Sequence, residues 1–195
     1  MGIIRRRLLP LAAASTLATA AVVALPDGSR ATTLASVTLS GGRLAFINNA
    51  PAATISFPTA TLNDTTQSIT TPLTVDTSDA TGSGAGWTVT ATSTTFTSAA
   101  NALPTTATTI QSAPTTACDT GAAGCTTATT NDSYPYTLPA APTAPTAMEL
   151  FNAPANTGMG DQTFTAIWTL AIPANAAASA APYASTWTLS LVTGP

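Results

Sequence analysis

Hydrophobic and polar residues alternate along three segments of the chain, a period of two that is typical of β-strands with one buried face. In residues 87–92 a tryptophan, a valine and an alanine share one face, and threonines share the other. Residues 163–172 and 186–192 alternate in the same way. Threonine suits such half-exposed positions because its branched Cβ favours strand dihedrals. The three segments are therefore predicted to be antiparallel strands.

Weaker strand signals occur in four further segments, and Gly, Pro, Asn and Asp interrupt the chain between them at short intervals. These segments are residues 35–40, 43–48, 53–57 and 73–76. No segment after residue 31 carries a sustained helical stripe of apolar residues. The pattern predicts an all-β protein, an antiparallel β-sandwich with immunoglobulin-like topology.

Residues 97–146 are rich in threonine, alanine and proline, and the alternation fades there. We expect a long loop or insertion within a single domain that spans residues 32–195, because this stretch has few large apolar side chains for a second core. Residues 133–139 could supply one strand. We hypothesise that Tyr134 and Tyr136 are exposed in this stretch and carry binding specificity.

The first 31 residues have the pattern of a secretory signal peptide. Residues 1–7 are basic, and residues 8–25 form an apolar run, with small-residue cleavage sites after Ala24 and after Ala31. A retained membrane anchor is the alternative, because the apolar region of a signal peptide is usually shorter than this run. We expect an exported protein with no membrane attachment after cleavage.

The charge balance narrows the range of ligands. After Ala31 the chain has one basic residue, Arg43, and seven acidic residues, so its net charge is −6. One arginine cannot neutralise several phosphates, so we expect no nucleic-acid partner, and polyanionic lipids and wall polymers are disfavoured. Only 6% of the residues are aromatic, so the core must depend on few large side chains.

The two cysteines, Cys118 and Cys125, lie close together in a chain that we expect to reach an oxidising compartment. This spacing predicts a local disulfide. A metal or redox pair is the alternative, but the spacing is not Cys-x-x-Cys and the chain has no histidine.

Candidate catalytic groups are few, because the chain contains neither histidine nor lysine. A Ser-His-Asp triad, a lysine nucleophile and a histidine-bound zinc ion are therefore impossible. Asp76 and Asp79 are interpreted as turn residues, with a weak calcium loop as the alternative. We expect no catalytic residue, no cofactor and no metal site. A secreted enzyme would need a cleft that gathers Asp76, Asp79 or Asp161 with another carboxylate.

All three tryptophans, Trp87, Trp168 and Trp187, are followed two residues later by Val or Leu. Strand periodicity places both members of each pair on the apolar face. Burial in the core is the interpretation we favour for Trp87 and Trp187, since an indole supplies ~150–250 Å² of contact area. The alternative is a position at the rim, where the indole could stack on a sugar or a partner.

Two blocks of the sequence resemble the WxL domain family of Gram-positive cell-surface proteins. Residues 76–98 (DTSDATGSGAGWTVTATSTTFTS) are similar to its first block, and residues 183–195 (YASTWTLSLVTGP) to its C-terminal block. Residues 156–175 fit the stretch that precedes the second block. The positions that match the motifs are Trp87, Thr88, Val89, Trp187, Thr188 and Leu189.

The resemblance implies a secreted module that binds the cell wall non-covalently, through peptidoglycan, and that works with other surface proteins. The valine at position 89, the Thr/Ala-rich stretch, the cysteine pair and the absence of lysine depart from the family pattern. The alternative hypothesis is a structural subunit of a surface complex that pairs with partners through an exposed strand edge.

Overall fold

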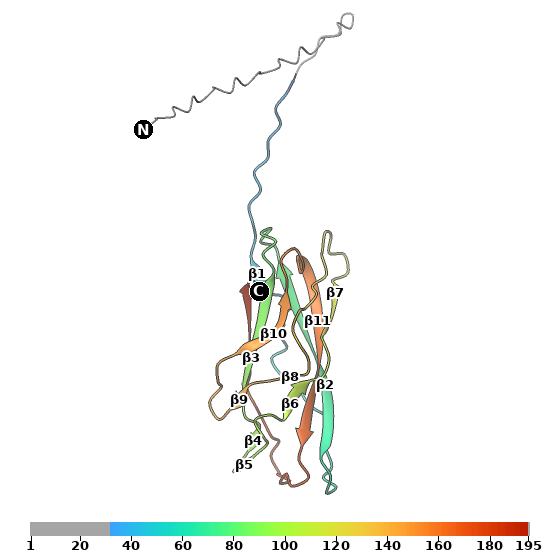
Figure 1. Ribbon diagram of the computed structural model, residues 1–195, viewed down its shortest axis with the longest axis vertical. Coiled ribbons are helices and arrows are strands. Elements are labelled where there is room, and N and C mark those ends of the chain that lie inside the picture. The colour runs from blue at the N-terminus through green and yellow to red at the C-terminus, as the bar shows by residue number, and fades with distance from the viewer. Residues whose placement is uncertain (1–31, 195) are drawn as a thin grey trace, which may run out of the picture. The chain divides into compact units, whose positions relative to one another are not determined.

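A computed structural model describes residues 32–194 of the chain (Figure 1). The predicted signal peptide and both of its candidate cleavage sites lie outside the described residues. The chain divides into two units, Met1–Thr38 and Leu39–Pro195. The described part of the first unit is irregular and exposed, and every strand belongs to the second. Residues 32–194 include no helix with the length and hydrophobicity needed to span a membrane.

The larger sheet, sheet A, is built on two long antiparallel strands, β2 (Gln67–Asp79) and β11 (Gly160–Ile172). They pair along their whole lengths, from Gly160 opposite Asp79 to Ile172 opposite Gln67. The strand order is β1-β2-β11-β6-β8, and β7 also pairs with β11. The added strands are β1 (Leu44–Phe46), β6 (Thr108–Ile110), β7 (Thr115–Cys118) and β8 (Tyr136–Thr137).

The smaller sheet, sheet B, has the order β10-β3-β12, in which the pairs are antiparallel. Its strands are β10 (Met148–Ala153), β3 (Trp87–Thr94) and β12 (Trp187–Thr193). A short strand, β9 (Ala140–Ala141), runs parallel to β3. A separate two-stranded ladder joins β4 (Thr97–Ser98) and β5 (Asn101–Ala102).

The core lies between the inner faces of the two sheets and follows from the alternation within their strands. In β2 and β11 the apolar residues of one face are buried, and the residues between them on the other face stay at or near the surface; Thr71 and Thr77 lie on the buried face of β2. An aromatic stack bridges the sheets: the rings of Phe151 in β10 and Phe164 in β11 are 5.1 Å apart. This stack gives a chain with few aromatic residues a continuous core.

The predicted all-β class is confirmed: the described residues contain no helix, and several antiparallel sheets pack together. The immunoglobulin-like topology stays a prediction. Strands occupy the three strongly alternating segments, all of residues 73–76 and part of residues 43–48. Residues 35–40 and 53–57 form no strand, contrary to our expectation.

The expectation of a long loop over residues 97–146 needs a correction. This stretch contains six short strands, β4 to β9, and four of them extend sheets A and B. Its few large side chains are placed in the main core, where Ile110 and Leu138 are fully buried. The stretch is therefore built into the sandwich, with irregular backbone between its short strands.

Candidate functional site

Trp87, at the start of β3, directly follows a glycine-rich turn and is fully buried. Its indole Nε1 donates a 2.8 Å hydrogen bond to the carbonyl oxygen of Gly158, and its ring stacks on Phe151 at 5.5 Å. Gly158 has a φ of +72°, and a Cβ at this position would come within 2.6 Å of the indole Nε1. The predicted burial of Trp87 is confirmed, and glycine is needed beside it.

Trp187, at the start of β12, is only half-buried, whereas we expected it to be buried like Trp87. Its ring lies 4.7 Å from the ring of Trp168, which is fully buried. Phe57 and Phe96 meet the Trp187 ring edge-on. Part of the indole therefore packs on the core, and the remainder lies at the rim, because solvent reaches the open end of the sandwich there.

The two motifs lie on neighbouring strands but do not converge on one site. Trp87 is opposite Thr193, and Trp187 is opposite Ser93, so the indoles occupy opposite ends of the β3–β12 ladder. Six residue steps separate them, roughly 20 Å along the strands. The Thr88 hydroxyl donates a 2.9 Å hydrogen bond to the Gly194 carbonyl and thereby joins the start of β3 to the residue that follows β12.

The remaining motif residues follow the same alternation. Val89 is fully buried, Leu189 is half-buried against the core, and Thr188 is exposed on the outer face. These placements give the motif residues a packing role within sheet B.

Cys118 and Cys125 form the predicted disulfide, with their Cα atoms 5.9 Å apart. Cys118 ends β7, opposite Gln162 of β11. The loop that the disulfide closes is also held by a bond from the Asp119 N–H to the Asp161 carbonyl. The disulfide therefore fixes this loop against the edge of sheet A.

Asp76 and Asp79 do not form a carboxylate pair, because they have different partners. Asp79 is buried and accepts hydrogen bonds from the Thr81 N–H and hydroxyl at 3.0 and 2.7 Å, as a turn residue does. Asp76 accepts a 2.6 Å bond from the Asn48 amide. Asp119 lies near Asp76, and burial together with the negative charge of Asp76 raises the pKa of the Asp119 carboxyl. In the described part of the chain, no group of three or more acidic or cysteine side chains is arranged to hold a metal ion.

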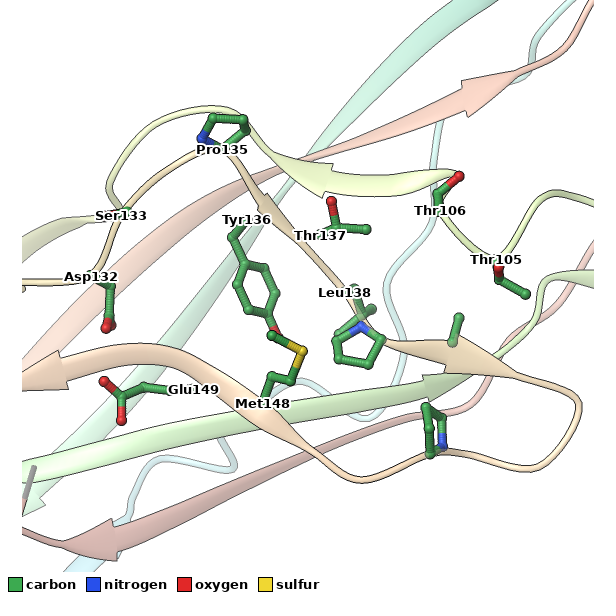
Figure 2. A pocket seen from close by; sticks show the side chains of 13 residues that line it. Thr105, Thr106, Asp132, Ser133, Pro135, Tyr136, Thr137, Leu138, Met148 and Glu149 are labelled. Atoms are coloured by element: carbon green, nitrogen blue, oxygen red, sulfur yellow. The ribbon is translucent and has the colours of Figure 1, made fainter.

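A polar pocket of about 560 Å³ opens between β10 and segments of the 97–146 stretch (Figure 2). Prolines, Met148 and Tyr136 form its apolar walls. The polar pocket also presents four hydroxyl groups and two carboxyl groups, from Thr105, Thr106, Ser133, Thr137, Asp132 and Glu149.

Asp132 and Glu149 come from segments that face each other across the polar pocket, and their side chains point toward one another (Figure 2). A hydrogen bond with Asp132, together with burial, raises the pKa of the Glu149 carboxyl. Glu149 Oε1 also accepts a 3.1 Å bond from Asn152 Nδ2, and Asp132 Oδ2 accepts a 3.0 Å bond from the Thr130 hydroxyl. These bonds orient both carboxyl groups at the pocket mouth and leave further oxygen lone pairs as acceptors.

The hypothesis that both tyrosines of this stretch are exposed is wrong. Tyr136 is only 8% exposed, and its hydroxyl has no hydrogen-bond partner among the described residues. Tyr134 is half-buried, and its hydroxyl donates a 2.8 Å bond to the Leu150 carbonyl. Burial raises the pKa of Tyr134 to about 12 and also raises the pKa of Tyr136. Tyr136 therefore contributes an apolar wall to the polar pocket.

A second cavity, which we call the apolar groove, has a volume of about 820 Å³ and lies at the Trp187 end of the sandwich. Its lining contains no charged and no amide side chain. Phe57, Phe96, Tyr183 and Trp187 supply its aromatic surface. Only hydroxyl and backbone groups are available there for hydrogen bonding.

Sequence reasoning did not single out Asp132 or Glu149. Each is an isolated acid in its segment, and they meet only because β10 folds back beside the segment that leads into β8. The one signal in the sequence was that charged residues are scarce, so each of the seven acidic residues after Ala31 was a candidate. Two of the seven line the same pocket.

Comparison with known families is consistent with the two tryptophan blocks. A family model described as WxL domain, surface cell wall-binding, matches residues 35–195. No curated protein and no solved structure matches the chain. The matched range includes all twelve strands and both cavities.

Proposed function

The chain belongs to the WxL domain family of surface cell wall-binding domains, and from this premise we propose that it is an exported module that binds peptidoglycan non-covalently and catalyses no reaction. The observation that carries the proposal is the family match over nearly the whole chain. The family description supports a cell-wall partner and a surface location. Peptidoglycan as the wall component, and the absence of catalysis, are our proposal.

The polar pocket supports peptidoglycan as the ligand. The glycan strands of peptidoglycan carry hydroxyl and acetamido N–H groups, and its peptides carry amines, so all of these present hydrogen-bond donors. Asp132 and Glu149 supply carboxyl acceptors, and the nearby threonine hydroxyls can both donate and accept. Met148 supplies an apolar surface on which the carbon face of a sugar ring can lie. The polar pocket is therefore the contact site that we propose.

The absence of catalysis is supported by the residue types of the chain. It contains neither histidine nor lysine, so a general base or a nucleophile of these types is not available. The carboxyl groups of Asp132 and Glu149 point toward one another (Figure 2), whereas the two carboxyl groups of a glycosidase flank the bond that is cleaved. We therefore assign them to binding.

Export is supported by the sequence of residues 1–31, with its basic start and apolar run. Since the sequence after Ala31 has a net charge of −6, attraction to anionic wall polymers is disfavoured, and a neutral or amine-bearing ligand is favoured.

Sedimentation with purified peptidoglycan sacculi tests the function. The exported chain is mixed with sacculi that have been stripped of anionic polymers, and the bound fraction is measured as a function of sacculus concentration. We expect saturable binding of the chain to the pellet. Protein that stays entirely in the supernatant would refute the proposal.

Paired variants test the site. Asp132→Asn with Glu149→Gln keeps the size of both side chains but removes their charge, and we expect at least about tenfold weaker binding. Asp64→Asn is the matched control, because Asp64 is exposed, lies outside both cavities and has a φ of +56°, which asparagine tolerates. If both proteins bind like the wild type, the wall contact lies elsewhere on the domain.

A further inference from the structure

One edge of strand β12 has no hydrogen-bonded partner strand, although β1 of sheet A lies near β12. β12 pairs with β3 alone, and the Thr94 N–H donates to the Thr186 carbonyl at the start of this ladder. In an antiparallel ladder the backbone N–H and C=O groups of successive residues point alternately to one side of the strand and to the other. In β12 the groups of the even-numbered residues therefore point to β3, and those of the odd-numbered residues point away from it. The N–H and C=O groups of Trp187, Leu189 and Leu191 therefore face the open edge. Within residues 32–194, no backbone hydrogen bond reaches them.

Residues 51–62, which we call the strap, line the apolar groove together with Trp187 and Leu189 but do not pair with β12. No backbone–backbone hydrogen bond involves the strap in the described structure. Its carbonyls at Ser56 and Thr61 accept side-chain bonds from Thr71 and Gln67. The strap is held mainly by its side chains, because Ile55 and Phe57 pack against the core, and it forms one wall of the groove.

The apolar groove lies beneath the strap and beside the open edge, so one chain segment could use both. Leu189 and Trp187 line the groove with their side chains while their backbone groups face the edge. A strand added to such an edge gains main-chain hydrogen bonds, and every second side chain points into the adjacent groove. A charge-free lining selects an uncharged strand with small or apolar side chains.

The chain itself contains a segment of this kind. From Thr32 to Gly42 it has no charged residue, and Leu34, Val37 and Leu39 are 93%, 81% and 87% exposed. Val37 and Leu39 fall on the same face of an extended chain. Exposed apolar side chains that follow a strand pattern are an unsatisfied interaction surface.

We propose that residues 34–39 of one molecule add as a strand to the open edge of β12 in a second molecule, with Val37 and Leu39 in its apolar groove. The segment in the groove must come from another molecule, because Leu39 cannot reach the groove of its own molecule. Leu39 is three residues from Gly42, whose N–H bonds to the Ala80 carbonyl, so it stays within about 11 Å of that end of β2. The groove residues Leu73 and Ile69 lie roughly 23 to 36 Å further along β2.

This contact is heterologous, because the segment and the groove are different surfaces of the molecule. Repeated from copy to copy, it closes into a ring or extends as a filament at the cell surface. It is independent of the polar pocket, so wall binding and self-assembly are separable properties.

Analytical ultracentrifugation of the exported chain over a wide concentration range tests the assembly. We expect oligomers that grow with concentration, and a monomer for the chain that carries Val37→Asp with Leu39→Asp. Both positions are more than four-fifths exposed, so these changes leave the fold intact. A wild-type chain that stays monomeric, or oligomers that persist in the double variant, would overturn the proposal.

A peptide of residues 32–42 tests the site directly. The labelled peptide is titrated into the monomeric double variant and followed by fluorescence anisotropy. Ala53→Glu places a charge on the exposed strap residue that lines the groove, and we expect at least about tenfold weaker peptide binding. Ala123→Glu in the exposed disulfide loop is the matched control and should bind like its parent.

Hydrogen exchange locates the bound peptide. We expect slower exchange in Trp187–Thr193 when the peptide is present, because the added strand pairs with the free N–H groups of β12. No anisotropy change, equal binding by both glutamate variants, or protection confined to other strands would overturn the assignment.

Discussion

Trp87 and Trp187 occupy opposite ends of one antiparallel ladder, and only Trp87 is fully enclosed. Trp87 has a hydrogen-bond partner for its indole N–H and lies against two phenylalanine rings. Trp187 packs on Trp168 but keeps part of its ring at the apolar groove. One repeated sequence motif therefore serves two different positions in the fold, and its two copies should respond differently to mutation.

Trp87→Ala is expected to destabilise the domain by ~3–5 kcal/mol, because it removes a fully buried indole and leaves the Gly158 carbonyl without its donor. Trp187→Ala is expected to cost less free energy of unfolding, since solvent already reaches its ring. Chemical denaturation of both variants measures the two losses. A larger loss for Trp187→Ala would contradict the burial that we describe.

Gly158→Ala is expected to destabilise the domain more than Gly121→Ala does. Both glycines have positive φ, +72° and +84°, so alanine adds backbone strain of ~1 kcal/mol or more at each position. Only at Gly158 does the new Cβ collide with the Trp87 indole, because nothing lies within 4 Å of the Cβ position at Gly121. The new Cβ at Gly158 would also lie 2.8 Å from the Ala153 Cβ. The difference between the two thermal midpoints measures these close contacts, and equal midpoints would show that Trp87 and Ala153 can shift to make room.

Tyr134→Phe and Tyr136→Phe form a second matched pair. The first removes the hydrogen bond to the Leu150 carbonyl and is expected to cost ~1 kcal/mol. The second removes a buried hydroxyl that has no partner among residues 32–194, so it should be neutral or stabilising. Urea denaturation of the two variants measures which one loses more free energy of unfolding. A loss for Tyr136→Phe as large as that for Tyr134→Phe would show that the Tyr136 hydroxyl has a hydrogen-bond partner.

Reduction of the disulfide is expected to have a modest effect. Cys118 and Cys125 are seven residues apart, and closing so short a loop contributes about 2 kcal/mol on the chain-entropy model. The Cys118→Ala, Cys125→Ala chain should therefore fold, with a lower thermal midpoint in non-reducing buffer. Loss of the folded state in this variant would mean that the disulfide holds more than its own loop.

The raised pKa of Glu149 sets the sign of a pH effect on stability. A carboxyl whose folded pKa lies above its ordinary value of 4.5 binds its proton more tightly in the folded state. Its stabilising contribution is complete below the unfolded pKa and is lost as the pH rises through the folded pKa. The thermal unfolding midpoint of Glu149→Gln should therefore rise relative to that of the wild type as the pH rises from about 4 to about 7. If the two midpoints change with pH in parallel, the pKa of Glu149 is not raised in the folded state.

Prediction of strands from the sequence succeeded where alternation was unbroken. The positions of β3, β11 and β12, and the side of each strand that carries its apolar residues, follow from their period of two, because alternation is a local property of the chain. We did not predict β10 from the sequence, because an irregularity between Glu149 and Phe151 shifts the register of its pairing with β3 and breaks the period of two. Residues 35–40 alternate like a strand but have no partner, and a strand needs a neighbour for its backbone hydrogen bonds.

The candidate sites were less accessible to sequence reasoning. The tryptophan motifs could be located, but the same Trp-x-aliphatic pattern precedes full burial at Trp87 and a rim position at Trp187. Exposure depends on which segments lie above each ring, and those come from distant parts of the chain. The polar pocket was missed for the same reason, since Asp132 and Glu149 become neighbours only through folding.

The sequence by itself determined the all-β class, the disulfide, the family and the charge that disfavours polyanionic ligands, because each of these depends on residue type and short-range spacing. Tertiary structure alone decided that residues 97–146 complete both sheets, that the two carboxyl groups meet in one pocket, and that β12 keeps an open edge beside the apolar groove. These features depend on contacts between residues far apart in the chain, where packing and backbone pairing outweigh local preference.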